Sequence, residues 1–241
     1  TGGGGSDEPD LPNLNEGKSV AGFPEWTDIS INYGNLTSAN HPRLFLRNKD
    51  IKAMCSKVLC GSDPNLAKLH KAILSGAGSL VKNTTPLKYE VTVGGQLVLT
   101  SRKALLRIVD LAYAYRVTGE ERYLEMADWN INTVCDFPDW HAEHFLDVAE
   151  MATAVAIGYD WLYNDLPDAT KEKARACLKS FALELAEPNS IYKKAGNWNQ
   201  VCLGGLICAA IAVYEDCPQL CDEVIRKSLA SNAKEVKAIY A

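Results

Sequence analysis

Several features are missing from this sequence of 241 residues, and each absence excludes a class of protein. No stretch approaches about 18 consecutive apolar residues, which is the length a helix needs to cross a bilayer, so a transmembrane segment is not expected. Basic residues form no cluster and the formal net charge is -5, so neither nucleic acid nor an anionic lipid surface is favoured as a partner. The eight cysteines lack the spacing of a four-Cys zinc site.

The cysteines that are present do not predict a disulfide framework. Cys177, Cys202 and Cys208 lie in segments with helical periodicity, where a thiol behaves as a small buried apolar group. Two pairs, Cys55 with Cys60 and Cys217 with Cys221, lie close together in the sequence and near expected helix ends. A bridge is possible within either pair, but the sequence alone does not indicate one.

The first 22 residues predict a flexible tether. They include a run of four glycines, lack an initiator Met and contain no core-forming residue before about Val20. The segment is similar to the one that follows the lipidated Cys of bacterial lipoproteins, which implies a lipid anchor upstream of residue 1 and a location in the periplasm or at the cell surface. A cloning remnant is the alternative. Residues 23–241 are expected to form one domain.

The remainder of the chain predicts helices that come in pairs. Apolar residues recur every three or four positions over 102–118, 145–162 and 198–215, and each of these first arms is followed by a second arm, at 120–135, 169–186 and 219–240. The first arms begin roughly 45 to 50 residues apart, as expected for a repeating helical hairpin.

The two arms of each pair differ in composition, which predicts their depth in the fold. First arms are rich in Ala, Gly and aliphatic residues, whereas second arms carry a charged face, so we expect an inner and an outer layer. The predicted fold is all-α, an incomplete α/α toroid of antiparallel hairpins. One small β-hairpin is expected near residues 89–99, where alternating apolar residues flank Gly94 and Gly95.

The final helix is expected to run to the last residue without a capping signal, which suggests a domain truncated at its C-terminus. Three hairpins would not close a ring.

The best candidate site lies where the chain enters the inner helices. Residues 194–200 contain Asn197, Trp198, Asn199 and Gln200, whose amides suit hydroxyl or carboxylate groups and whose indole suits a sugar ring. Gly204 and Gly205 follow in the same helix, where each costs roughly 1 kcal/mol relative to Ala unless close packing compensates.

The second entry loop, residues 137–144, supplies Trp140, His141 and His144. His141 and His144 with Asp147 have the spacing of a helical metal site, but no third ligand is fixed by spacing. Neither a metal nor another cofactor is therefore expected.

Five segments taken together resemble the N-terminal α/α toroid of heparinase II/III-like polysaccharide lyases. They are HPRLFL at 41–46, TGEERYL at 118–124, HFLDVAE at 144–150, GYDWLY at 158–163 and NWNQV at 197–201. The resemblance covers about residues 40–241, and it rests on the order of these segments because none is specific alone.

The resemblance implies a reaction, a partner and a set of residues. Such lyases remove the C5 proton of a uronic acid in an acidic polysaccharide, such as a glycosaminoglycan, and expel the 4-linked sugar. Asn197 matches the family's carboxylate-neutralising Asn, with Asn199 as the alternative and His144 as its helper, while Trp140, His141, Trp198 and Gln200 are expected to contact substrate. The family's catalytic Tyr would fall beyond residue 241, so little turnover is expected from this chain alone.

Two other functions remain open. An α/α-toroid glycoside hydrolase needs a pair of carboxylates across its cleft, and Asp139, Glu143, Asp147 and Glu150 form the available cluster. A non-catalytic glycan-binding or helical scaffold protein needs neither arrangement.

Overall fold

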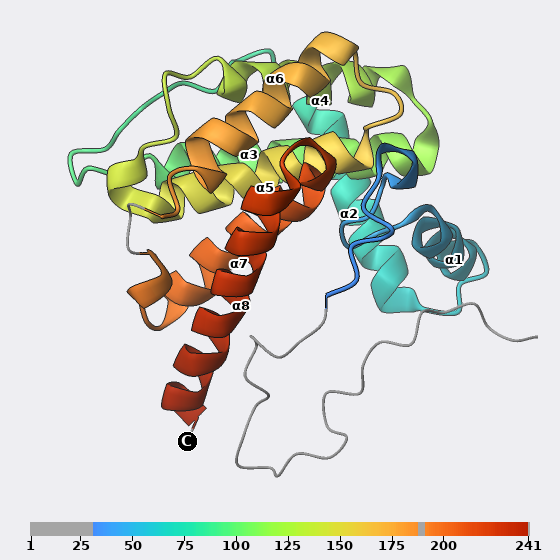
Figure 1. Ribbon diagram of the computed structural model, residues 1–241. Helices are drawn as coiled ribbons and strands as arrows, with labels where there is room; N and C mark the ends of the chain where they lie inside the picture. The colour runs from blue at the N-terminus through green and yellow to red at the C-terminus, as the bar shows by residue number, and fades with distance from the viewer. Residues whose placement is uncertain (1–30, 188–190, 241) are drawn as a thin grey trace, which may run out of the picture.

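The computed structural model describes residues 31–187 and 191–240, and every regular element within these ranges is a helix (Figure 1). This confirms the all-α prediction; the predicted tether, residues 1–22, lies outside the described residues. The α-helices are α1 (Asn48–Leu59), α2 (Pro64–Leu80), α3 (Val98–Thr118), α4 (Glu121–Cys135), α5 (Phe145–Trp161), α6 (Asp168–Leu178), α7 (Asn197–Ala212) and α8 (Pro218–Tyr240).

The predicted β-hairpin near residues 89–99 is wrong. A tight turn does form there, because the Gly95 N–H donates to the Thr92 carbonyl and the Thr92 N–H to the Gln96 carbonyl, both at 2.9 Å. Helix α3 already begins at Val98, however, so the second half of the apolar alternation belongs to a helix. Leu97, just before α3, is fully buried and donates its N–H to the Asp147 carboxylate, which fixes this start.

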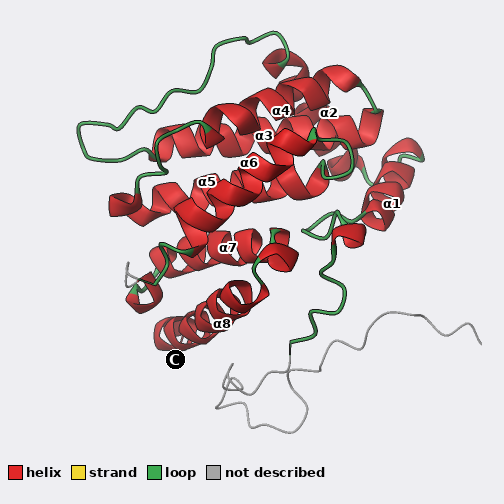
Figure 2. Cartoon of the chain, turned by 45° about the horizontal axis from the view of Figure 1, so that its top comes forward, coloured by secondary structure: helices red, strands yellow, loops and turns green. Residues whose placement is uncertain are grey.

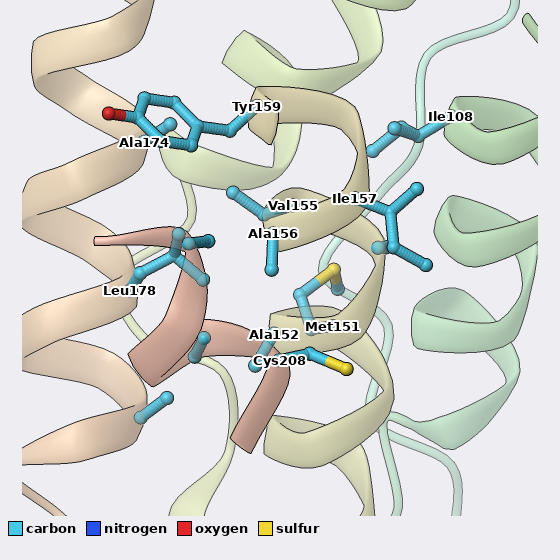
Figure 3. Packing of buried hydrophobic residues seen from close by; sticks show 14 of the residues in the cluster. Ile108, Met151, Ala152, Val155, Ala156, Ile157, Tyr159, Ala174, Leu178 and Cys208 are labelled. Atoms are coloured by element: carbon cyan, nitrogen blue, oxygen red, sulfur yellow. The ribbon is translucent and has the colours of Figure 1, made fainter. Parts of the chain in front are cut away.

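Three helices lie next to one another and carry most of the core. Helix α5 packs against both α3 and α7, and Figure 2 shows α5, α7 and α8 in succession across the molecule. Ile108 from α3, Leu178 from α6 and Cys208 from α7 all lie close to α5 (Figure 3). Almost all of α5 is buried, as its high content of Ala and aliphatic residues predicts.

Two glycines allow these helices to approach closely. A Cβ atom at Gly205 of α7 would overlap the backbone of Ala149 in α5, and one at Gly158 of α5 would overlap Ile108 of α3. Gly204 has open space where its side chain would be. Close packing therefore compensates for one of the two α7 glycines, Gly205, and not for the other.

None of the helices in the described part of the chain is both long and apolar enough to cross a membrane.

Candidate functional site

The N-terminal ends of α3, α5 and α7 meet at one end of the helical layer. Two contacts establish this: the Leu97 N–H, at the start of α3, donates to Asp147 Oδ2 of α5 at 2.6 Å, and the ring of His144, just before α5, packs edge to face on Trp198 of α7 at 5.0 Å between centroids. The segments leading into α5 and α7 lie at the same end in Figure 2. The loops singled out by the sequence are therefore brought together.

Asp147 organises this end of the molecule. Its side chain is fully buried in the first turn of α5, and it lies 2.9 Å from His141 Nδ1 and 2.7 Å from His144 Nδ1 besides accepting from Leu97. The partial positive charge of the α5 N-terminus also favours the carboxylate. With each Nδ1–H directed at Asp147, Nε2 is the remaining nitrogen of each ring.

His141 is held in a fixed position in the loop before α5. Its backbone has a φ of 62°, an uncommon value for a residue other than Gly, and its N–H donates to Asp139 Oδ1 at 2.8 Å. Its Nε2 lies 3.2 Å from Glu143, so both ring nitrogens have acidic partners. The structure buries His141, which was predicted to contact substrate, and gives it a supporting position.

Tyr89 is a member of this site that the sequence did not reveal. Its hydroxyl donates to Asp139 Oδ1 at 2.5 Å. Burial and the hydrogen bond to that carboxylate raise the pKa of Tyr89 to about 12, so the phenol remains protonated at neutral pH. The sequence predicts a strand at Tyr89, and only its contact with a residue 50 positions away identifies it as part of the site.

Of the two candidate asparagines, Asn197 is the exposed one. It is the first residue of α7, whereas Asn199 is fully buried. The Asn199 amide donates to the Lys194 carbonyl at 3.0 Å and to Ser231 Oγ at 2.8 Å, and its oxygen accepts from Asn232. Asn199 therefore ties α7 to α8 and has no free group for a substrate, so its alternative assignment as the catalytic amide does not fit.

Trp198 and Gln200 occupy different positions in the same turn. Trp198 is half-buried, with His144 on it edge to face and the Lys194 ammonium 5.7 Å from the ring centroid. A sugar would have to share or displace that cation contact. Gln200 is exposed and free to meet a ligand at the rim.

Trp140 is not available to a substrate. It was predicted to contact sugar, but its ring is fully buried, its Nε1–H donates to the Val134 carbonyl at 3.0 Å, and Phe181 packs edge to face on it. Such a tryptophan is a core anchor that fixes the loop carrying His141.

The acidic and histidine side chains described at this end do not form a metal-binding group. Within residues 31–187 and 191–240, His, Cys, Asp and Glu side chains form no group of three or more that could hold a metal ion.

A second polar cluster lies at the opposite end of α5, and it is structural. Asp160 is fully buried, accepts the backbone N–H groups of Arg43 and Leu44, and lies 2.6 Å from His41 Nδ1. Trp161 Nε1 donates to the Leu44 carbonyl at 2.9 Å. Asp160 therefore ties the segment before α1 to α5, and Trp161 belongs to the core.

Comparison with models of known protein families and with curated proteins gave no match. The geometry above is therefore the basis for a functional assignment.

Proposed function

We propose that this chain supplies the helical part of a polysaccharide lyase that cleaves a uronic-acid-containing polysaccharide by β-elimination. The observation that carries the proposal is the surroundings of Trp198, which has the His144 ring edge to face and the Lys194 ammonium over its own ring. Asn197, an exposed amide, directly precedes Trp198 as the first residue of α7.

Asn197 fits the neutralisation of a uronate. Removing the C5 proton places negative charge on a carbon next to a carboxylate, so the reaction needs donors that stabilise the carboxylate as charge develops. The Asn197 amide donates without introducing a charge, and the unpaired N–H groups in the first turn of α7 add partial positive charge nearby.

His144 is suited to assist Asn197, because its ring is held in one orientation. Asp147 engages its Nδ1, which fixes the ring and leaves Nε2 for a substrate group or a proton. Asp147 is thus a positioning residue, and His144 is the group that would touch the substrate.

Lys194 carries a positive charge that complements an acidic polysaccharide. The protein is acidic overall, so an acidic polysaccharide requires local positive charge. Lys194 is exposed and lies over Trp198, where an ammonium group can attract a uronate while the indole contacts the ring.

We also propose that the helix pairs are part of an α/α toroid. Each of α3 and α7 contacts the helix that follows it, α5 lies between them, and the three N-terminal ends meet. An experimental structure in which α3, α5 and α7 do not curve around a common axis would contradict this arrangement.

The hydrolase alternative is less well supported because its carboxylates are already engaged. Asp147 is buried with three partners, Asp139 accepts from Tyr89 and His141, and Glu150 pairs with Arg102. Glu143 is largely exposed and lies by His141. No two of these acids are left free as the acid and nucleophile that a glycosidase needs.

Calorimetric titration of the chain tests the proposal, with uronic-acid oligosaccharides compared against neutral ones of equal length. We expect binding of acidic oligosaccharides only, and Asn197→Ala should weaken it by about tenfold or more, as a lost hydrogen bond to a charged group does. Where ultraviolet absorbance of the unsaturated uronide shows turnover, the same change should lower kcat about 10²- to 10³-fold.

The matched control is Asn164→Ala, which removes an exposed amide at the opposite end of α5 and should leave binding unchanged. Equal affinity for neutral and acidic oligosaccharides, or full affinity in Asn197→Ala, would contradict the assignment. Cleavage without an unsaturated product would favour the hydrolase, and absence of any glycan binding would favour a helical scaffold.

A further inference from the structure

Two thiols lie side by side at the start of α8. Cys217 directly precedes the helix and Cys221 lies in its first turn, and their Sγ atoms are 3.6 Å apart. The backbone holds the two residues together, because the Cys221 N–H donates to the Cys217 carbonyl at 3.0 Å. The other contact of Cys221, with the Val213 carbonyl at 4.0 Å, leaves its sulfur next to Cys217.

The sulfurs of Cys217 and Cys221 are neighbours, and a disulfide requires them to come closer still. A disulfide has an S–S bond of about 2.05 Å and Cα atoms roughly 4.4 to 6.8 Å apart. Residues four apart on a helix have Cβ atoms about 5 to 6 Å apart, and a disulfide needs about 3.5 to 4.5 Å, so the backbone at Cys217, just before the helix, has to move as the bridge closes.

The two thiols differ in the way that sequential disulfide exchange requires. Cys217 is partly exposed, whereas Cys221 is fully buried. A hydrogen bond from the Cys221 thiol lowers the pKa of Cys217. Because Cys217 lies at the N-terminus of α8, the helix dipole also favours its thiolate form. The same bond, together with burial, raises the pKa of Cys221.

The four buried cysteines outside this pair provide a contrast, whereas the exposed Cys60 has no neighbouring thiol to form a bridge with among the described residues. All eight thiols are free in the structure. Cys135 and Cys177 also neighbour one another, but both are buried, which keeps a reagent away from them. Burial raises the pKa of Cys202 to about 12 and that of Cys208 to about 11, as expected for inert core thiols.

We propose that Cys217 and Cys221 form a reversible disulfide at the start of α8, made by exchange with a low-molecular-weight disulfide. The Cys217 thiolate attacks one sulfur of that disulfide, forming a mixed disulfide and releasing one thiolate. The Cys221 thiol then loses its proton and attacks Cys217 Sγ, which expels the second thiolate. The protein dithiol is oxidised by two electrons, and the small disulfide is reduced to two thiols.

The bridge would fasten a junction that also holds the N-terminal segment. Glu215 lies two residues before Cys217 and pairs with His41 and Arg43. Fixing residues 217–221 restricts the loop that carries Glu215 and the start of α8 together. The inference stands on the thiol geometry and is independent of any activity on polysaccharide.

The experiment is incubation of the whole chain with glutathione disulfide, followed by thiol counting, intact mass and peptide mapping. We expect peptide mapping to find a cross-link within residues 217–221 with a mass lower by two hydrogens, separate from the glutathione adduct expected on the exposed Cys60, and both to be reversed by dithiothreitol. A higher Tm for the oxidised form should accompany it.

Two variants separate the steps. Cys221→Ser should stop at a stable glutathione adduct on Cys217, whereas Cys217→Ser should form neither adduct nor bridge at Cys221. Cys202→Ser is the control and should still form the bridge. Eight free thiols after incubation, a cross-link between Cys135 and Cys177, or a glutathione adduct on Cys221 in Cys217→Ser would each overturn the proposal.

Discussion

Asp147 shows how a single buried carboxylate can define a site. It accepts from a backbone N–H just before α3 and binds two imidazoles from the loop before α5, so three groups from two segments depend on one side chain. The histidines drew attention in the sequence as possible ligands. The structure makes the acid between them the central residue, because it is the fully buried one.

Replacing Asp147 by Ala should destabilise the fold by about 3 to 5 kcal/mol, since breaking a buried charged network leaves its partners unpaired. Urea denaturation measures the loss. The control is Glu223→Ala, which removes an exposed partner of Lys227 and should cost less than about 1 kcal/mol. Similar losses for the two variants would contradict the central role of Asp147.

The pairing of Glu215 with His41 and Arg43 predicts a particular pH dependence. Burial alone would raise the pKa of Glu215, but hydrogen bonds from His41 and Arg43 lower it from 4.5 to about 2. A lowered folded-state pKa stabilises the fold above the unfolded-state pKa, and this contribution is lost as pH falls from about 4.5 to about 2.

The stability difference between the wild type and Glu215→Gln should therefore be largest above about pH 5 and shrink towards pH 2. Denaturant titrations of both proteins across this range measure the difference. A difference that stays constant from pH 6 to pH 2 would show that Glu215 is not held in this way.

His41 contributes in the opposite pH direction. Burial alone would lower the pKa of His41, but hydrogen bonds to Asp160 and Glu215 raise it, so the contribution of His41 to the free energy of unfolding is lost as pH rises above 6.5.

At the scale of helices, the adjacent glycines of α7 allow a matched test. Gly205→Ala should destabilise by about 1 to 3 kcal/mol, because its methyl group would overlap the α5 backbone at Ala149 and force the helices apart. Gly204→Ala meets open space and should stabilise by about 0.5 to 1 kcal/mol through helix propensity. Thermal denaturation compares them, and equal effects would contradict the observed packing.

The helices were predictable where the signal is local. Thr118 and Gly119 predicted the end of α3, and Gly119 indeed has a φ of 71° there. The start of α3 was not predictable, because residues 96–99 alternate as a strand would and only the distant Asp147 favours a helix. Local periodicity therefore gives the helices, and contacts between segments decide their ends.

The same limit applied to the site. The sequence located both entry loops, since amides, histidines and tryptophans are concentrated there. It could not tell Asn197 from Asn199, because the choice depends on Ser231 of α8, 32 residues further along. Trp140 was misassigned because an indole that fills a core and one that faces a ligand are identical in sequence.

At the scale of the whole molecule, the helices are expected to differ in the free energy of local unfolding. Helices α5 and α7 lie at the centre of the core, whereas α1 and α2 each contain a single buried hydrophobic residue, Ile51 and Ala77. Few buried contacts allow local opening at low free energy. Helix α2 packs on α3, and α1 is held in addition by the segment before it, where Asp160 binds the backbone of Arg43 and Leu44.

Hydrogen exchange should reflect that division. In the wild type, amides of α5 and α7 should exchange most slowly and those of α1 and α2 most rapidly. Asp160→Asn keeps the shape of the side chain but removes its charge and one of its two acceptor oxygens, so the bonds to residues 43 and 44 weaken. We expect exchange in α1 and α2 to accelerate while α7 is little changed, because α7 is held by α5 and α8 and does not depend on that segment. A uniform acceleration across all helices would instead show that the described chain opens as one cooperative unit.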